Sequence, residues 1–258
     1  MSGIRKASTQ AASPWFTRPK PNTQARLRLF CFPFAGSGAQ IFRNWPQHLP
    51  PTVEVWAAQL PGRVPRMREP PHTSLTTLVE EIAHVIRPYL DRPFAFFGHS
   101  MGAMISFELA RLLRRDEANA PLHLFVSGRR APQILDTDPV IYNLPDAEMI
   151  KELRRLNGTP PEVLEHPELM QLMLPLLRAD FEVVKTYRYL AEPPLDCPLS
   201  VFGGLQDTEV KREHLEGWRE QTTSNFTLRM FDGDHFFIQQ AEPALLRALA
   251  HELWRIDC

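Results

Sequence analysis

The chain has 258 residues, of which 43% are hydrophobic and 23% are charged, and this is the composition of an ordinary globular protein. A formal net charge of -1 gives no reason to expect nucleic acid or an anionic membrane as a partner. No apolar stretch of the sequence approaches the length that a membrane-spanning helix needs.

The cysteines and the amino-terminal residues indicate the cellular compartment in which the protein is expected to work. Cys31, Cys197 and Cys258 are widely spaced and form neither a disulfide framework nor a zinc-binding pattern, which favours a reducing compartment, and we expect a cytoplasmic protein. Residues 1–53 contain no Asp or Glu, a composition that resembles an organellar transit peptide. Prolines interrupt this stretch and it has no helical period. We therefore favour a flexible tail over residues 1–24 that docks through Trp15 and Phe16.

Strands alternate with helices through the first half of the chain. Apolar runs predict strands at 26–32, 53–58, 94–98 and 122–127. Helical spacing of apolar residues predicts helices at 42–49, at 75–90 and directly after Ser100. Strands that alternate with helices predict a mostly parallel central sheet flanked by helices on both faces.

The alternation stops between residues about 131 and 192, where only helical patterning is present. Two interpretations stay open for this region: a helical layer of the core, or a lid that covers the mouth of the sheet and shapes an apolar chamber. We favour the lid, because the region follows the sheet end where Ser100 lies. Strands at 198–203 and 226–231 and helices at 212–221 and 242–255 then complete the pattern, so we expect one domain over residues 25–258.

The most informative motif is Gly98-His99-Ser100-Met101-Gly102, which lies between a predicted strand and a predicted helix. G-x-S-x-G in this setting is typical of a nucleophile elbow, a tight turn that exposes a serine hydroxyl above the sheet. Side chains at the two glycines would collide with the neighbouring strand or helix. The sequence therefore predicts Ser100 as a nucleophile.

A serine needs a base, and the base needs an orienting acid. His235 is the histidine that follows a predicted strand, and we expect it to be the base, while His99 is expected to pack. Asp207 also follows a strand, and Asp232 and Asp234 are too near His235 in sequence to fit under its ring. The order Ser100, Asp207, His235 is the one expected for this arrangement.

Backbone N–H groups of Met101 and of Ala35 (or Phe34) are expected to stabilise an oxyanion. The turn that holds Ala35 is not a dinucleotide fingerprint, because Ile41 occupies the third glycine position of G-x-G-x-x-G. Likewise, the zinc motif H-E-x-x-H fails at Arg255. The sequence calls for no metal and no redox cofactor.

Several motifs together resemble the type II thioesterases, the free-standing editing partners of non-ribosomal peptide and polyketide synthases. The similarity spans about residues 15–250. It is carried by the G-x-S-x-G motif and by seven other groups of residues: Trp15-Phe16, Phe32-Pro33-Phe34-Ala35-Gly36, Gln59-Leu60-Pro61-Gly62-Arg63 with Glu69-Pro70, Ser127-Gly128-Arg129 with Ala131-Pro132, Arg178-Ala179-Asp180-Phe181, Gly203-Gly204 with Asp207, and Gly233 with His235-Phe236-Phe237. Family members vary at the position of Asp234. Ser37 replaces the usual second glycine of Ala-Gly-Gly, a change that we expect to matter little.

The resemblance implies an α/β-hydrolase with a helical lid that cleaves acyl thioesters from the phosphopantetheine arm of carrier proteins and so removes misprimed or stalled acyl groups. It implies the same roles for Ser100, Asp207, His235, Ala35 and Met101, and acyl or peptidyl carrier domains as partners. Three alternatives stay open: a general carboxylesterase or lipase, a chain-releasing fatty-acyl thioesterase, and a degenerate hydrolase that only binds a synthase. The residues alone indicate a serine acyl-hydrolase with an apolar, lidded pocket.

Overall fold

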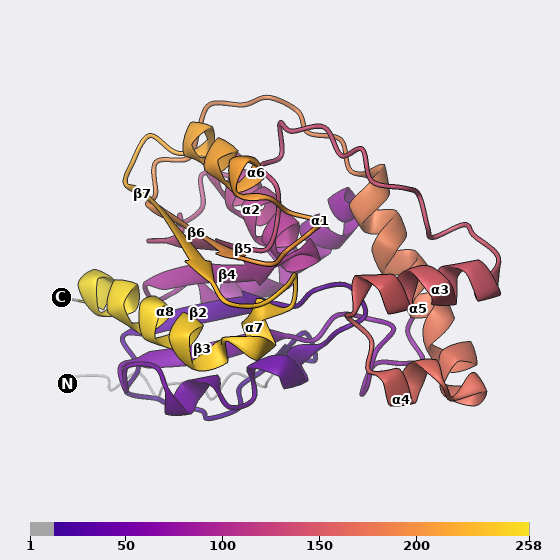
Figure 1. Ribbon diagram of the computed structural model, residues 1–258. Coiled ribbons are helices and arrows are strands. Elements are labelled where there is room, and N and C mark those ends of the chain that lie inside the picture. The colour runs from indigo at the N-terminus through magenta and orange to yellow at the C-terminus, as the bar shows by residue number, and fades with distance from the viewer. Residues whose placement is uncertain (1–12, 258) are drawn as a thin grey trace, which may run out of the picture.

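The computed structural model describes residues 13–257, which form a seven-stranded sheet in the order β1-β3-β2-β4-β5-β6-β7 (Figure 1). Neighbouring strands pair in parallel except β1 and β3, which are antiparallel. The strands are β1 (Phe16–Thr17), β2 (Leu27–Phe32), β3 (Val53–Ala58), β4 (Phe94–His99), β5 (Leu124–Ser127), β6 (Leu199–Gly204) and β7 (Phe226–Phe231). The mostly parallel sheet predicted from the sequence is confirmed.

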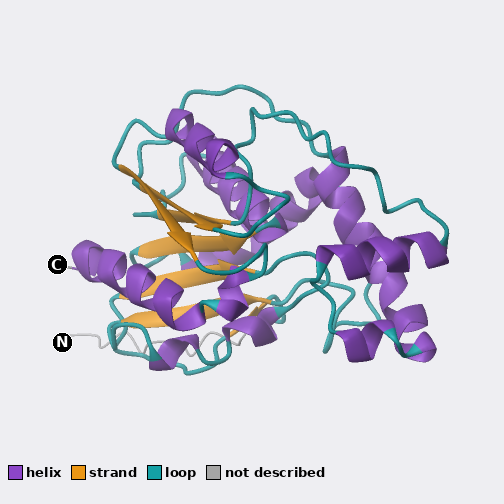
Figure 2. Ribbon diagram, viewed as in Figure 1, coloured by secondary structure: helices purple, strands orange, loops and turns teal. Residues whose placement is uncertain are grey.

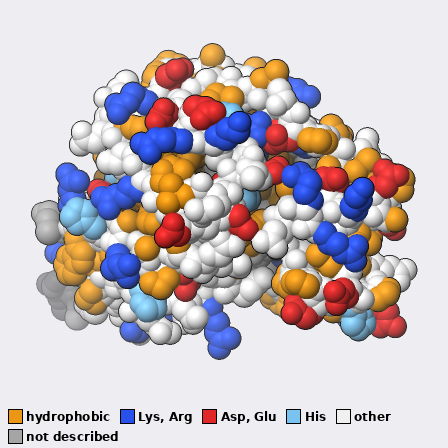
Figure 3. All heavy atoms as spheres, in the orientation of Figure 1, with side chains coloured by type: hydrophobic (Ala, Val, Ile, Leu, Met, Phe, Trp, Pro, Cys, Tyr) orange, Lys and Arg blue, Asp and Glu red, His pale blue; other side chains and the backbone are white. Residues whose placement is uncertain are grey.

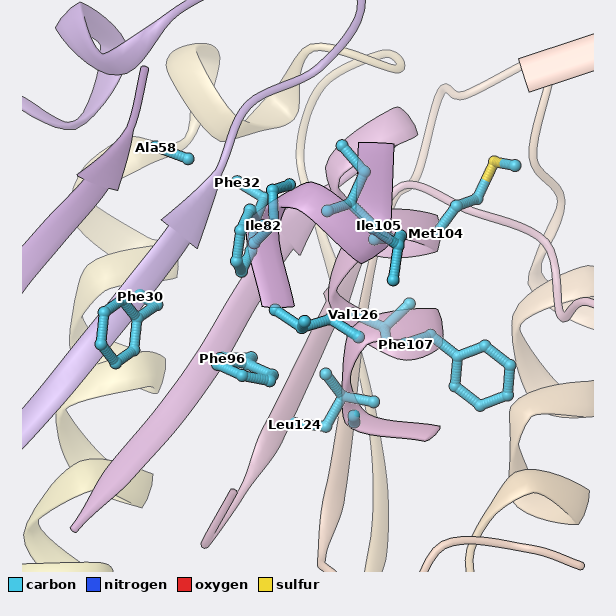
Figure 4. Packing of buried hydrophobic residues seen from close by; sticks show 14 of the residues in the cluster. Phe30, Phe32, Ala58, Ile82, Phe96, Met104, Ile105, Phe107, Leu124 and Val126 are labelled. Carbon is cyan, nitrogen blue, oxygen red and sulfur yellow. The ribbon is translucent and has the colours of Figure 1, made fainter. Parts of the chain in front are cut away.

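Helices cover both faces of this sheet, because side chains of the buried strands alternate between two apolar cores. On one face, Phe30 and Phe96 pack with residues of α1 (Leu75–Ile86) and α2 (Met101–Arg115), and Figure 4 shows both phenylalanines together with Met104, Ile105 and Phe107 of α2. On the other face, Leu29 packs with α8 (Glu242–Asp257). The short helices α6 (Arg212–Glu216) and α7 (Phe237–Gln240) complete the body of the fold.

A helical insertion, residues 131–192, lies between β5 and β6 and contains no strand, as the sequence predicts. It comprises α3 (Asp146–Leu156), α4 (Pro161–Leu164) and α5 (Pro167–Thr186). These helices lie together to one side of the strands (Figure 2). They share an apolar cluster of their own: Met149, Leu153, Leu164, Met170, Leu174 and Leu177. The insertion therefore buries a small core that is separate from the two cores of the sheet.

Of the tail expected over residues 1–24, the structure describes residues 13–24, and most of residues 17–24 are exposed. Trp15 and Phe16 dock as expected, with exposed fractions of 5% and 4%. Phe16 also begins an edge strand, which the sequence analysis did not predict, and it pairs with Ala58 of β3. Two consecutive buried aromatic side chains supply enough apolar contact to fix so short a strand. The rest of the expected tail, residues 1–12, lies outside the described residues.

Prolines and a glycine account for three predicted helices that are shorter or of another type. The helix expected at 42–49 is instead two single 3-10 turns, Ala39–Phe42 and Trp45–Gln47, and the second contains Pro46. The helix expected at 75–90 leaves α-helical geometry at Arg87, next to Pro88. The helix expected at 212–221 becomes a 3-10 helix from Gly217 onward. Proline removes an N–H donor and glycine weakens helical preference, which explains each boundary.

Candidate active site

Ser100 stands at the tip of a tight turn between β4 and α2, as the G-x-S-x-G motif predicts. Its backbone has φ 53° and ψ -111°, a conformation that residues other than glycine rarely adopt. The two glycines are needed because of close backbone contacts. A Cβ on Gly98 would lie 2.1 Å from the carbonyl oxygen of Gly102, and a Cβ on Gly102 would lie 2.0 Å from that of Phe32. The turn therefore fits against the end of β2 only with glycine at both positions.

The structure brings Ser100, His235 and Asp207 into one hydrogen-bonded row, although Ser100 and His235 are 135 positions apart in sequence. The Nε2 atom of His235 lies 3.0 Å from Ser100 Oγ, and Nδ1 lies 2.8 Å from Asp207 Oδ2. Because a carboxylate only accepts, Nδ1–H donates to Asp207, which leaves the Nε2 lone pair facing the serine hydroxyl. This row has the geometry of a serine nucleophile, its base and an orienting acid.

Asp207 is held by the backbone that follows it. Its Oδ1 atom accepts the N–H groups of Glu209 and Val210 at 2.8 and 2.9 Å, which leaves Oδ2 for His235. The competing Asp234 makes no contact with the His235 ring and accepts hydrogen bonds from Asn157 Nδ2 and the Phe236 N–H. Burial opposes ionisation of Asp234, but these hydrogen bonds outweigh burial and hold its pKa below the usual value.

His99 packs, as expected, but its ring also holds the loop of His235, which the sequence analysis missed. The ring is fully buried, and Nε2–H donates to the backbone oxygen of His235 at 3.0 Å. Nδ1 must then accept from the hydroxyl of Ser127, 2.8 Å away. Burial, together with the nearby His235, lowers the pKa of His99 well below its usual value, so the ring is neutral. The contact joins residues 136 positions apart, and no local motif signals it.

The two expected oxyanion donors lie beside the serine. Met101 is the first residue of α2, and Ala35 lies in the turn after β2 and lines the same cavity as Ser100. Within the described residues, neither N–H donates to another protein group. Both are therefore free to donate to a substrate oxygen, and the amino terminus of α2 adds a favourable dipole.

The cavity that contains Ser100 and His235 has a volume of about 120 Å³ and lies between the sheet and the helical insertion. Part of its wall is apolar, with Leu153, Leu177 and Phe181 contributed by α3 and α5. Another part is ionic and is formed by Arg129, Arg130, Asp136, Asp138 and Lys185. These side chains pair with one another, for example Lys185 Nζ with Asp136 Oδ1 at 2.7 Å. The chamber that contains the serine therefore offers both apolar contacts and paired charges.

Two further properties concern ligands and membranes. Among residues 13–257, no group of three or more His, Cys, Asp or Glu side chains is arranged to hold a metal ion. None of the described helices is both long and apolar enough to span a bilayer. On the face shown in Figure 3, basic and acidic side chains are interspersed.

The sheet order, the elbow and the hydrogen-bonded row of Ser100, His235 and Asp207 define a serine hydrolase of the α/β-hydrolase class. Within this class the chain belongs to the thioesterase family, because the thioesterase domain matches residues 27–253. The resemblance seen in the sequence is thereby confirmed.

The chain is similar to two bacterial proteins named for gramicidins and to a type II thioesterase of solved structure. The chain is 47% identical over 239 residues to Gramicidin S biosynthesis protein GrsT of Aneurinibacillus migulanus, covering 93% of each chain. It is 46% identical over 244 residues to a protein of Brevibacillus parabrevis named Linear gramicidin dehydrogenase LgrE, again covering 93% of each. Among solved structures, the type II thioesterase BorB from the borrelidin biosynthetic cluster has a TM-score of 0.86 at 34% identity, covering 94% of this chain and 99% of BorB.

Proposed function

We propose that this protein hydrolyses acyl thioesters carried on the phosphopantetheine arm of acyl or peptidyl carrier domains, and thereby clears misacylated or stalled modules of a synthase. The single observation that carries the reaction type is the row Ser100–His235–Asp207 at the mouth of a partly apolar chamber. The similarity to GrsT, a biosynthesis protein, and to BorB, a type II thioesterase, supports the editing role and the carrier-borne substrate.

The reaction then proceeds in two halves. Ser100 Oγ attacks the thioester carbonyl while His235 Nε2 accepts the hydroxyl proton, and the N–H groups of Ala35 and Met101 stabilise the oxyanion. The C–S bond breaks, and His235 returns the proton to the departing pantetheine thiolate. A water molecule next attacks the acyl-Ser100 ester, again with His235 as base, and the carboxylic acid leaves. Asp207 holds His235 in the required tautomer throughout.

We further propose that the helical insertion, residues 131–192, is the lid of this chamber. Leu153, Leu177 and Phe181 of the insertion line the cavity that also contains Ser100, which supports this assignment. The insertion has its own apolar cluster, so it can form a wall independently of the sheet. The acyl chain would lie between this wall and the elbow.

We propose a cytoplasmic location, and the state of two thiols supports it. Cys31 and Cys197 are free and buried. Burial raises the pKa of the Cys31 thiol well above its ordinary value and that of Cys197 to about 12, so both thiols stay protonated. Free thiols fit a reducing compartment.

The relative LgrE is named a dehydrogenase, an activity that would require a dinucleotide cofactor. The turn after β2 in this chain does not favour binding of a dinucleotide. Ile41 occupies the third glycine position of the fingerprint. The Gly36 N–H, which such a turn would offer to a pyrophosphate, donates instead to the Asp180 carboxylate at 2.7 Å. A second anion at that place would be repelled.

The test is intact-protein mass spectrometry of a carrier domain loaded with acetyl-phosphopantetheine, incubated with wild type, Ser100→Ala or Ser106→Ala. Ser106 is a matched control, because it is a buried serine of the same helix whose hydroxyl donates to the Ala103 carbonyl. We expect acyl loss with wild type and Ser106→Ala, and a rate lower by several orders of magnitude with Ser100→Ala. Acyl loss at the wild-type rate with Ser100→Ala would refute the assignment. Cleavage of p-nitrophenyl esters without acyl loss from the carrier would identify an esterase instead.

A further inference from the structure

Asp180 is a buried carboxylate outside the Ser100–His235–Asp207 row. It lies on α5 of the helical insertion and is 4% exposed. Burying a carboxylate without partners is unfavourable, so the groups that compensate its charge indicate what it does.

Its partners come from two different loops of the sheet. Asp180 Oδ2 accepts the backbone N–H of Gly36 at 2.7 Å, a contact across 144 positions of sequence. The same oxygen forms an ion pair with the buried guanidinium of Arg63. Arg63 also donates to the Pro61 carbonyl at 3.0 Å, which fixes its side chain in the loop after β3. One carboxylate oxygen therefore joins α5 to the loops that follow β2 and β3.

Gly36 belongs to the turn that presents the proposed oxyanion donor. Ala35 directly precedes it, and the Ser37 N–H donates to the Phe34 carbonyl at 3.0 Å, so the four residues 34–37 form one closed turn. Gly36 has φ 76°, and a Cβ there would lie 2.5 Å from a methyl carbon of Leu177 on α5. Helix α5 therefore packs directly on this turn. Anchoring the Gly36 N–H fixes the peptide that follows Ala35, and with it the direction of the Ala35 N–H.

We propose that Asp180 is a positioning residue for catalysis: it anchors the Gly36 N–H from the helical insertion and thereby holds the Ala35 N–H toward the substrate oxyanion. This inference rests on the proposed function, in which Ala35 is an oxyanion donor. It makes α5 part of the catalytic apparatus. A displacement of α5 away from the turn would release the Gly36 N–H and the oxyanion site together.

Three substitutions separate positioning from a purely structural ion pair. Asp180→Ala removes the acceptor of the Gly36 N–H. Asp180→Asn removes the charge but keeps an oxygen that can accept from Gly36. Arg63→Met removes the ion pair but leaves the Asp180–Gly36 contact in place. Asp146→Asn is the matched control, because Asp146 is an exposed carboxylate of the same insertion that pairs with Arg178.

For Asp180→Ala we expect kcat on a soluble acyl-pantetheine thioester to fall by about 100- to 1000-fold with KM changed less than threefold, the range for loss of one oxyanion donor. The inhibition constant of an alkyl trifluoromethyl ketone, which forms an oxyanion on the serine, should rise by a similar factor. Asp180→Asn should restore most of the activity, Arg63→Met should keep more activity than Asp180→Ala, and Asp146→Asn should match wild type.

The proposal is overturned if Asp180→Ala keeps kcat within threefold of wild type. It is also overturned if kcat falls in step with the melting temperature across the variants, so that Arg63→Met loses as much kcat as Asp180→Ala. If Asp180→Ala does not fold because it leaves Arg63 as an unpaired buried charge, the double variant Arg63→Met/Asp180→Leu decides, since it removes both charges together with the acceptor of the Gly36 N–H. A kcat of this double variant within threefold of Arg63→Met overturns the proposal, and a further fall of about 100-fold supports it. The proposed function fails separately, by full activity of Ser100→Ala. An inactive Ser100→Ala beside an active Asp180→Ala refutes the positioning role alone.

Discussion

Asp207→Asn is expected to disable the enzyme without unfolding it, because the backbone determines how the new amide must lie. Oδ1 of Asp207 accepts two backbone N–H groups, from Glu209 and Val210, at 2.8 and 2.9 Å. An asparagine must place its oxygen there, since an NH₂ group cannot accept. Its NH₂ group is then forced toward His235 Nδ1, which lies 2.8 Å from Oδ2 in the wild type.

The tautomer of the histidine follows from that orientation. Facing a donor, His235 Nδ1 must become the acceptor, and the ring proton moves to Nε2. Nε2–H then faces Ser100 Oγ at 3.0 Å and cannot take up the serine proton. For the same substitution in a well-studied serine protease the wrong tautomer lowers kcat about 10⁴-fold, which corresponds to about 5.4 kcal/mol of transition-state stabilisation. We expect a loss of about this size.

The assay is kcat for a soluble acyl thioester beside thermal unfolding, for Asp207→Asn and Asp207→Ala. Asp207→Asn keeps both backbone contacts and should melt close to the wild type. Asp207→Ala leaves the N–H groups of Glu209 and Val210 without their acceptor and should lose about 1–3 kcal/mol of stability for each donor that stays buried and unpaired. An Asp207→Asn enzyme within tenfold of the wild-type kcat would refute the reasoning, because the two backbone contacts would then not fix the amide.

Two further predictions concern the fold that carries the site. Gly102→Ala places a Cβ 2.0 Å from the Phe32 carbonyl oxygen, so the end of β2 must shift. Because Ala35 follows this strand end and moves with it, we expect a lower melting temperature and a kcat reduced about 100-fold or more. An unchanged melting temperature together with an unchanged kcat would contradict this expectation. Burial, and to a lesser extent the charge of Arg255, lowers the pKa of the His123 ring to about 4. Below pH 6.5 the unfolded chain therefore binds a proton that the folded chain does not, and the free energy of unfolding decreases as the pH is lowered. Between pH 6.5 and 4.5 this histidine accounts for about 2 kcal/mol of lost stability. Urea titrations should show a shallower acid decline in His123→Phe but not in a control at the exposed His48, and an equal decline in all three proteins would contradict the assignment.

The nucleophile and its two partners could be predicted because each sits in a pattern that local chemistry dictates. The turn at Ser100 fits against Phe32 only with Gly98 and Gly102 on either side, and these glycines lie within five consecutive residues of the sequence. Asp207 and His235 each follow a strand, and the two strands pair in parallel, so that their carboxyl ends lie at one edge of the sheet. The strand order itself was not needed for this inference.

The residues that support the site could not be predicted, because their roles depend on contacts between distant segments. His99 reaches the His235 backbone across 136 positions, and Asp180 reaches Gly36 across 144. In the sequence, Asp180 belongs to a group of residues that carries the family resemblance, but no local pattern indicates what its carboxylate contacts. Its burial beside Arg63 becomes visible only when α5 is placed on the turn after β2. Edge strand β1 escaped prediction for the same reason, since two residues form a strand only when a partner edge is present.

The chamber is lined partly by loops of the sheet and partly by helices of the insertion. This limits which substitutions can change the preference for one acyl substrate over another. The proposed reacting groups, Ser100 and His235, belong to loops at the ends of strands, while Leu153 of α3 and Phe181 of α5 form part of the wall of the same cavity. Substitutions on α3 can reshape that wall without touching the reacting groups. Helix α5 has less freedom, because Asp180 on the same helix anchors the Gly36 turn. Changes in chain-length preference at unchanged turnover should therefore come from α3, whereas changes on α5 that move its backbone should alter preference and turnover together.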